Sequence, residues 1–243
     1  TGLLYEEGVV RGVVAEWQGR RFEVEGLIIA ADGVESRVAA WAGLDTQLAL
    51  ADTMACAQVL LAGIDWEPTC LGYWIDEEIA PGGYAWVFPK GDGRANVGLG
   101  VQADLAEETV LTYLQRFIER EGALSAGSPV TLVVGNVPVA LPGTQLVTDG
   151  LMLVGDAARQ VDPLTGGGII NAMEAGRLAA QVAAEALDGG DRSAKGLARY
   201  QEQVDRTMGR HLARNYRLRQ RFPPGQRASR GFLRIFAVAA GGK

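Results

Sequence analysis

Short alternations of apolar and polar residues dominate the first 140 positions of the chain and predict β-strands. Residues 1–30 contain three such stretches, the last of them at 22–30. We expect these three to form antiparallel strands, with the first hairpin turning at Glu6-Glu7-Gly8. Further strands are predicted at residues 50–62, 71–75, 84–89, 94–99 and 130–138.

In the second half of the chain, apolar residues recur every three or four positions, which predicts helices. Gly189-Gly190-Asp191 breaks this pattern once, and Ser193 or Asp191 is expected to cap the helix that follows. Pro223-Pro224-Gly225 breaks it again. The predicted helices are residues 105–121, 169–187, 194–221 and 228–240.

The stretch at residues 150–180 places candidate ligand-binding groups between a strand and a helix. A buried strand at 151–154 leads into Gly155-Asp156, and the glycines 166–168 open the long Ala-rich helix. A carboxylate at Asp156 accepts hydrogen bonds from a polyol, and free backbone N–H groups near residues 167–169 favour negative charge. A flavin offers both partners, because its ribityl chain carries hydroxyls and its N1–C2=O edge becomes anionic on reduction.

This stretch resembles the second flavin-binding motif of FAD-dependent monooxygenases and reductases of the p-hydroxybenzoate hydroxylase type. The matching positions are Gly155, Asp156, Ala157, Ala158, Asp162, Pro163, Gly166, Gly168 and Gly176. The string IIAADGVESRV at residues 28–38 resembles another motif of that family, in which a strand end brings an Asp and backbone groups near the cofactor. Ser36 is expected to cap the short helix that follows, rather than to touch a ligand. The resemblance implies FAD, held by Asp32, Gly33, Arg37, Gly155, Asp156, Pro163, Gly166, Gly167, Gly168 and Ile169.

Three aromatic residues alternate with small or apolar ones in the stretch at residues 81–101. The period of two puts Tyr84, Trp86 and Phe88 on one face of a strand. Their pattern, Tyr-x-Trp-x-Phe-Pro-Lys followed by Asn96-Val97-Gly98-x-Gly100, resembles the geranylgeranyl reductase family. That resemblance implies reduction of isolated C=C bonds in a prenyl chain, with hydride delivered from N5 of reduced FAD. Each aromatic either fills an ordinary core or lines the cavity of a hydrophobic lipid substrate.

Two other functions stay open. The first is a flavin-dependent monooxygenase or halogenase on the same scaffold. The second is a non-catalytic fragment, because the family opens with a GxGxxG unit for the ADP half of FAD and the chain holds no credible copy. Gly98-x-Gly100-x-x-Ala103 fits that pattern, but the next helix is predicted to begin near Leu105, with Asp104 as its N-cap, and not at the glycines. Because the chain also begins at Thr1-Gly2 within strand-like sequence, we expect a fragment that binds FAD weakly or not at all.

Charge is distributed unevenly along the chain. The net charge is −6, yet the residues from Arg206 onward include nine arginines, Lys243 and no acidic residue. Either this tail neutralises the acidic remainder, which the usual behaviour of charge runs favours, or it docks peripherally on an anionic membrane that holds a lipid substrate. Nucleic-acid binding is not expected, because the remainder of the chain is acidic. The residues concerned are Arg206, Arg210, Arg214 and Arg217 on one helical face, with Phe222, Phe232, Ile235 and Phe236 as added apolar surface.

Little other chemistry is visible in the sequence. The only histidine, His211, is expected at the surface, no metal site is expected, and Cys56 and Cys70 are expected as free thiols in a cytoplasmic protein. No charge-free apolar run reaches about 18 residues, so no transmembrane helix is predicted. The flavin would carry the reaction, with NAD(P)H or ferredoxin as the electron donor. The sequence does not determine the oligomeric state.

These patterns predict an α+β or α/β fold: the C-terminal portion of a p-hydroxybenzoate hydroxylase-like FAD-binding fold. Residues 1–44 and 138–188 are assigned to a partial FAD-binding domain. Residues 45–137 are assigned to an antiparallel-sheet substrate domain, and residues 189–243 to C-terminal helices packed behind it.

Overall fold

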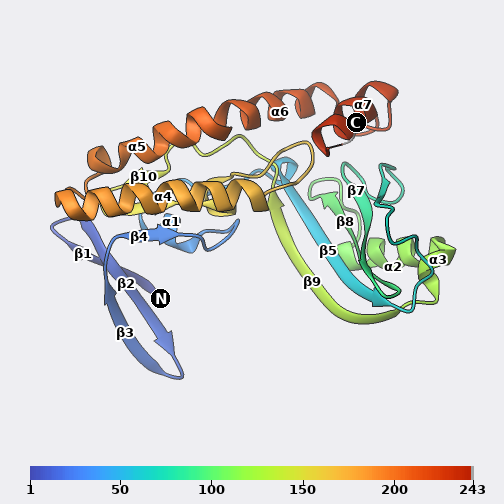
Figure 1. The fold of residues 1–243 in the computed structure, drawn as a ribbon, viewed down its shortest axis with the longest axis horizontal. Helices are drawn as coiled ribbons and strands as arrows, with labels where there is room; N and C mark the ends of the chain where they lie inside the picture. The colour runs from blue at the N-terminus through green and yellow to red at the C-terminus, as the bar shows by residue number, and fades with distance from the viewer. Residues whose placement is uncertain (242–243) are drawn as a thin grey trace. The chain divides into compact units, whose positions relative to one another are not determined.

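The computed structural model describes residues 1–241, which fold into two compact units. Residues 1–47 and 138–218 form the first unit, and residues 48–137 with the chain from Arg219 onward form the second (Figure 1). The tail that the sequence analysis grouped as one set of helices therefore divides between the two units.

The first unit contains two small sheets, and one predicted strand is divided between them. Strands β1 (Gly2–Glu6), β2 (Val9–Trp17) and β3 (Arg20–Glu25) form an antiparallel sheet. The prediction of one strand over residues 22–30 is wrong, because the chain changes partners after Glu25. The Gly26 N–H still donates to Arg11 of β2, whereas the Ile28 N–H donates to Gly150. Strand β4 (Ile28–Ala30) then pairs in parallel with β11 (Leu151–Leu153), beside β10 (Val147–Thr148).

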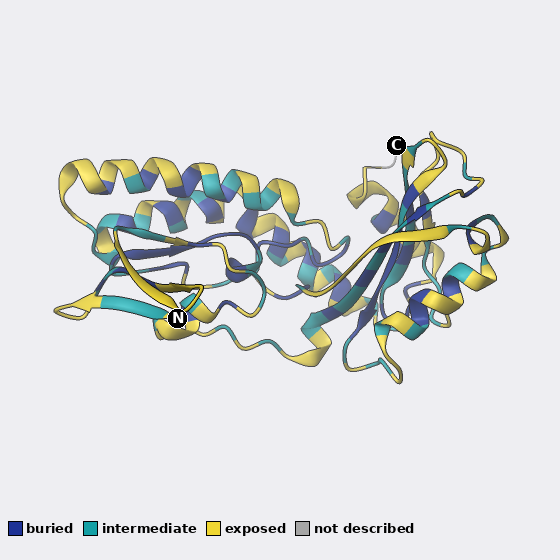
Figure 2. Ribbon diagram, turned by 90° about the horizontal axis from the view of Figure 1, so that it is seen from below, coloured by how far each residue is buried: buried dark blue, intermediate teal, exposed yellow. Residues whose placement is uncertain are grey.

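Helices cover the second of these sheets. Helix α4 (Ile169–Gly189) ends at Gly190, whose φ of 70° is the left-handed conformation that glycine adopts without strain. Helix α5 (Ala194–Val204) is capped by Ser193, whose Oγ accepts from the Gly196 N–H at 3.1 Å. A π-helical turn at Asp205–Gly209 then separates α5 from α6 (Arg210–Arg221), where one continuous helix was predicted. The inward sides of the helices and the strands beneath them are buried, and the outward sides are exposed (Figure 2).

The second unit is built on a five-stranded sheet with the order β6–β7–β8–β5–β9. A short 3₁₀ turn at Leu50–Asp52 precedes β5. Helix α2 packs on one face of this sheet, over the buried side chains of Ala85, Val87, Val97 and Leu99. The elements are β5 (Thr53–Ala62), β6 (Gly72–Trp74), β7 (Tyr84–Gly91), β8 (Arg94–Gln102), α2 (Val110–Arg120), α3 (Gly122–Ser125), β9 (Ser128–Pro138) and α7 (Arg230–Ala239).

Helix α2 begins later than the sequence predicted. Its N-cap is Thr109, whose Oγ1 accepts from the Thr112 N–H, whereas Asp104 accepts from the Gln102 side chain at 2.8 Å. The glycines 98 and 100 lie inside β8, so no helix opens at the GxGxxA pattern. The pattern therefore lacks the strand–turn–helix geometry that binds a pyrophosphate. Among residues 1–241, no helix is long and apolar enough to cross a membrane.

Candidate functional site

The parallel pair β4–β11 brings two distant loops to one sheet edge. Ala30 pairs with Leu153, and the Val154 N–H donates to the Ala30 carbonyl at 2.9 Å. Asp32-Gly33 follows the first strand and Gly155-Asp156 the second, so both loops leave the sheet at its carboxyl end. In sheets of this kind ligands bind outside the carboxyl ends of the strands.

Asp156 presents a carboxylate that has no hydrogen-bond or ion-pair partner in the described part of the chain. It lies in a 3₁₀ turn at Gly155–Ala158 and is half-buried, and its side-chain oxygens accept no hydrogen bond within residues 1–241. Burial raises the pKa of this carboxyl. A half-buried carboxylate that is not used by the protein is an acceptor available to a ligand.

A buried hydrogen-bond chain supports the turn before Asp156. Gly155 has a φ of 65°, and its N–H donates to Gln160 Oε1 at 2.7 Å. The Gln160 amide donates to the Tyr200 hydroxyl at 3.2 Å, which itself donates to the Leu153 carbonyl at 2.6 Å. Burial raises the pKa of Tyr200 to about 12, so the phenol keeps the proton it donates. Gln160 and Tyr200 were not predicted from the sequence.

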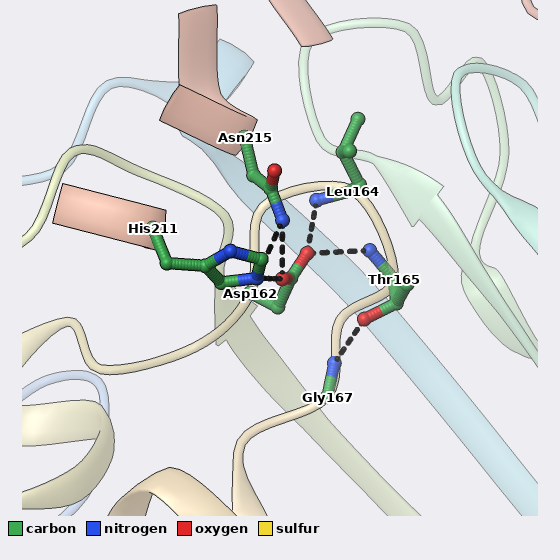
Figure 3. Close-up of polar contacts among 6 residues, drawn as sticks. All are labelled: Asp162, Leu164, Thr165, Gly167, His211 and Asn215. Carbon is green, nitrogen blue, oxygen red and sulfur yellow. Dashed lines mark hydrogen bonds and ion pairs between the residues drawn. The ribbon is translucent and has the colours of Figure 1, made fainter. Parts of the chain in front are cut away.

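The loop that opens α4 is organised around Asp162. One carboxylate oxygen, Oδ1, accepts from the N–H groups of Leu164 at 2.9 Å and Thr165 at 3.1 Å (Figure 3). The backbone of Asp162 pairs with the same loop, since its N–H donates to Gly167 and its carbonyl accepts from Gly166, which has a φ of 70°. Pro163 is buried within the loop. Hydrogen bonds to the side chain and backbone of one aspartate, Asp162, therefore hold the loop together.

The other oxygen of Asp162 faces helix α6. Oδ2 accepts from Asn215 Nδ2 at 2.6 Å and lies 3.3 Å from His211 Nε2 (Figure 3). Asn215 is buried, whereas the His211 side chain is 61% exposed. His211 is thus a surface residue as predicted, but its contact with the glycine loop was not foreseen. Its spacing of four from Asn215, which places both on one helix face, was the signal in the sequence.

Free N–H groups occur where α4 begins, but one of the three predicted positions is occupied. The Gly167 N–H donates to Thr165 Oγ1 at 3.2 Å, so it is occupied. The N–H groups of Gly168 and Ile169 have no hydrogen-bond partner within residues 1–241, and the Ile169 side chain is 80% exposed. A Cβ atom placed on Gly168 would lie 3.4 Å from Asp156 Oδ1. The free donors and the free carboxylate are therefore neighbours.

The loop after β4 uses its polar groups locally. Both oxygens of Asp32 accept within the loop, from the Ser36 hydroxyl at 2.8 Å and the Val38 N–H at 2.9 Å. Ser36 caps α1 (Arg37–Trp41), as predicted, by accepting from the Ala39 N–H. Arg37 stacks on the Trp41 ring at 5.2 Å. Contacts of Asp32, Gly33 and Arg37 with a cofactor stay predictions.

In the second unit the predicted aromatic residues share one sheet face. Tyr84, Trp86 and Phe88 are half-buried, opposite the core face of β7. Across β8 they pair with Gly100, Gly98 and Asn96. A Cβ on Gly98 would lie 2.5 Å from the Trp86 ring, so glycine leaves room for that ring. We call Tyr73, Tyr84, Trp86 and Phe88 the aromatic wall.

Helix α7 lies against this aromatic wall. The centroid of the Phe236 ring lies 5.2 Å from that of Tyr84 and 5.8 Å from that of Tyr73, and both pairs are edge-on. Phe236 and Phe232 are only 5% and 4% exposed, so the prediction that they add apolar surface is wrong. The sequence showed their hydrophobic character but not the sheet that covers them.

The arginines predicted to share a face of the tail are exposed. Within residues 1–241, no ion pair with a carboxylate involves Arg206, Arg210, Arg214 or Arg217. We call these four the arginine stripe. Cys56 and Cys70 are free thiols, and no cluster of His, Cys, Asp or Glu in the described part of the chain is arranged to hold a metal ion.

Comparisons with known proteins agree with this architecture. Residues 52–137 match the geranylgeranyl reductase catalytic domain. A digeranylgeranylglycerophospholipid reductase from Methanosphaerula palustris is 46% identical over 90% of this chain and 55% of its own length. A second such reductase, from Methanocella arvoryzae, is 43% identical over 90% of this chain and 56% of its own length. The chain thus spans little more than half of these relatives.

A solved structure extends the match to the fold. A geranylgeranyl bacteriochlorophyll reductase-like protein from Thermoplasma acidophilum superposes with a TM-score of 0.85 at 38% identity, over 90% of this chain and 56% of its own. A triple mutant of the flavin-dependent brominase Bmp2 superposes with a TM-score of 0.68 at 14% identity, over 99% of this chain and 64% of its own, which shows a common fold alone. The fold is that of the FAD-dependent flavoproteins. Over the part that it spans, the chain is similar to proteins of the geranylgeranyl reductase family.

Proposed function

We propose that this chain supplies the flavin-facing loop and the substrate wall of an FAD-dependent reductase that saturates C=C bonds in a prenyl lipid. The observation that carries the proposal is the proximity of the Asp156 carboxylate to the N–H groups of Gly168 and Ile169, none of which has a hydrogen-bond partner within residues 1–241. FAD fits this donor set, because its ribityl hydroxyls need an acceptor and its reduced ring needs donors for a developing negative charge. Pro163, Gly166 and Gly167 shape the loop around that position.

The chain's own groups have separate tasks in this proposal. Asp156 orients the ribityl chain by accepting hydrogen bonds, and the start of α4 stabilises the negative charge of the reduced ring. Reduced FAD, when bound, supplies the hydride. In this proposal binding and electrostatics are the protein's contribution.

The aromatic wall supports an apolar, elongated substrate. Tyr84, Trp86 and Phe88 present rings to one sheet face, with the Trp86 indole N–H donating to Gln58 Oε1 at 3.1 Å. Satisfying that N–H within the sheet leaves the ring faces for apolar contact. The names of the relatives suggest a phospholipid with two geranylgeranyl chains as the substrate.

The test is a product analysis under two atmospheres. The chain is supplied with excess FAD, reduced with dithionite under argon and given a geranylgeranyl phospholipid. The expected result is a product heavier by two hydrogens for each double bond reduced. An oxygenated product that forms only in air with NAD(P)H would instead identify a monooxygenase. Flavin binding without either product would overturn the proposed reaction, and no flavin binding at all would identify a non-catalytic fragment.

We also propose that the arginine stripe, on the π-helical turn and α6, contacts an anionic membrane surface. Its four side chains are exposed and form no ion pair with a carboxylate within residues 1–241, so they are available to an anionic surface. A prenyl phospholipid substrate resides in such a membrane, so the contact would bring the protein to its substrate.

A further inference from the structure

We propose that Asp162 is a positioning residue for the flavin loop, and that helix α6 holds it in place through Asn215 and His211. The inference rests on the proposed function, because it takes the start of α4 as the flavin-facing element. It adds residues that contact no cofactor themselves but set the direction of the groups that do.

The geometry divides the Asp162 carboxylate into two halves with different partners. Oδ1 accepts from two successive loop N–H groups, at Leu164 and Thr165. Oδ2 accepts from Asn215 and lies beside His211. Figure 3 shows the loop donors on one side of the carboxylate and the α6 side chains on the other. A single side chain thereby connects the glycine loop to a helix about 50 residues further along the chain.

The loop bonds decide which N–H groups remain for a ligand. Once Thr165 is anchored by Asp162, its Oγ1 accepts from Gly167, and the Gly167 carbonyl accepts from the Asp162 N–H. The first unoccupied donors are then Gly168 and Ile169, beside Asp156. Release of Asp162 would free the loop to rotate these donors away from the carboxylate.

The two α6 side chains that contact Asp162 suit a negatively charged carboxylate. Asn215 is 4% exposed and its Nδ2 lies 2.6 Å from Oδ2, which is the short distance typical of a bond to a charged acceptor. His211 Nε2 lies 3.1 Å from the same amide nitrogen, so all three side chains form one cluster. Loss of a hydrogen bond to a buried charge corresponds to a change of about 10- to 100-fold in the equilibrium it supports.

The first arm of the test needs no flavin. Amide hydrogen exchange of the loop at residues 163–169 is measured for Asp162→Ala, Asn215→Leu and His211→Gln in the whole chain. We expect faster exchange of about 10-fold or more for the first two and a smaller change for the third. Asp191→Asn is the matched control, because Asp191 also accepts a nearby backbone N–H, from Ser193, but lies before α5. Loop exchange within twofold of the parent in both Asp162→Ala and Asn215→Leu would overturn the proposal.

The second arm measures FAD affinity and the reduction potential of the bound flavin. A positioning role predicts weaker binding, and a lower potential because the reduced form loses more stabilisation than the oxidised form. A tenfold preferential loss lowers a two-electron potential by about 30 mV. A merely structural Asn215 would lower the melting temperature but leave the potential unchanged, which would also overturn the proposal. Failure of the parent chain to bind FAD would count against the proposed function only, since the exchange arm decides the positioning role independently.

Discussion

A side-chain carbon placed on Gly168 would lie 3.4 Å from Asp156 Oδ1, so the carboxylate that follows β11 and the glycine that begins α4 are immediate neighbours. Twelve positions of sequence separate the two residues. The loop anchored at Asp162 brings them together, and among residues 1–241 the carboxylate and the adjacent N–H groups have no hydrogen-bond partner. An acceptor and a set of donors thus lie side by side at a strand end, where a ligand carrying both kinds of group can bind.

Gly168→Ala tests this proximity. The added methyl would lie 3.0 Å from Val161 Cγ2 and point toward Asp156, so it crowds the proposed ribityl position. We expect FAD affinity to fall about tenfold, with a stability loss of about 1 kcal/mol. Gly176→Ala is the control, because no atom lies within 4 Å of its Cβ position in the middle of α4. That change should leave affinity unaltered and raise stability by up to about 1 kcal/mol. Equal FAD affinities in the two variants would argue against the site.

Asp156→Asn should have opposite effects on stability and on binding. Burial raises the pKa of Asp156 in the folded chain, so this group binds a proton more tightly in the folded state than in the unfolded state. Stability from this group is present at acidic pH and lost as pH rises through the folded pKa. The variant should therefore be more stable than the parent at neutral pH, by up to about 1 kcal/mol after solvent screening, with the difference vanishing in acid. FAD affinity should fall about tenfold. Thermal melts from pH 3 to 8 and flavin titrations measure both, and a variant less stable at neutral pH would contradict the assignment.

Phe236→Ala tests whether α7 is held by the aromatic wall. The ring is buried against Tyr73 and Tyr84, so its removal leaves a cavity and should cost about 3 kcal/mol of unfolding free energy. Leu233→Ala on the same helix removes a side chain that is 39% exposed and should cost less than about 1 kcal/mol. Urea denaturation compares them. Similar losses in both variants would show that α7 does not pack as described.

The two thiols should differ in reactivity. Burial raises the pKa of Cys56 to about 12, which keeps it as the unreactive thiol, whereas Cys70 is exposed. One thiol per chain should react rapidly with a disulfide reagent at pH 8, and the second only after addition of denaturant. Cys70→Ser should abolish the fast phase and Cys56→Ser should leave it intact. Two fast thiols in the native protein would contradict the burial of Cys56.

The arginine stripe predicts salt-sensitive binding to anionic vesicles. Each arginine near such a surface contributes about 1 kcal/mol, so the triple variant R210E/R214E/R217E should lose at least about 100-fold in vesicle affinity. R20E/R21E/R94E changes the net charge equally at other exposed arginines and should retain more of the binding. Co-sedimentation with neutral and anionic vesicles makes the measurement. Equal binding to both vesicle types, or equal losses in both variants, would remove the membrane proposal.

Sequence patterns located most elements because the signals concerned are local. Ser36 caps α1 and Gly168 is the N-cap residue of α4, where a capping side chain and a glycine-opened helix were expected. The alternation over β7 correctly separated Tyr84, Trp86 and Phe88 from the buried Ala85 and Val87. Periodicity of this kind reports which side of an element is buried, but not what buries it.

The errors fall where a residue's partner is distant in sequence. Residues 22–30 have the pattern of one strand, yet β4 leaves the first sheet because β11, over 100 residues later, offers it a parallel partner. Phe236 is apolar in either environment, and only its contact with Tyr84 decides that it is buried. The sequence predicts a free N–H at Gly167, but in the structure this group donates to the Thr165 hydroxyl.

The sequence by itself predicted the family resemblance, the proposed cofactor loops and the two strand ends that carry them, since these depend on residue identity and short spacing. Only the tertiary structure decided which polar groups remain free. Asp32 is used to hold α1 and Asp162 to hold the glycine loop, whereas the Asp156 carboxylate accepts no hydrogen bond from residues 1–241. The three carboxylates have the same chemistry, and their different roles arise because hydrogen bonding depends on which donors the folded chain brings within reach.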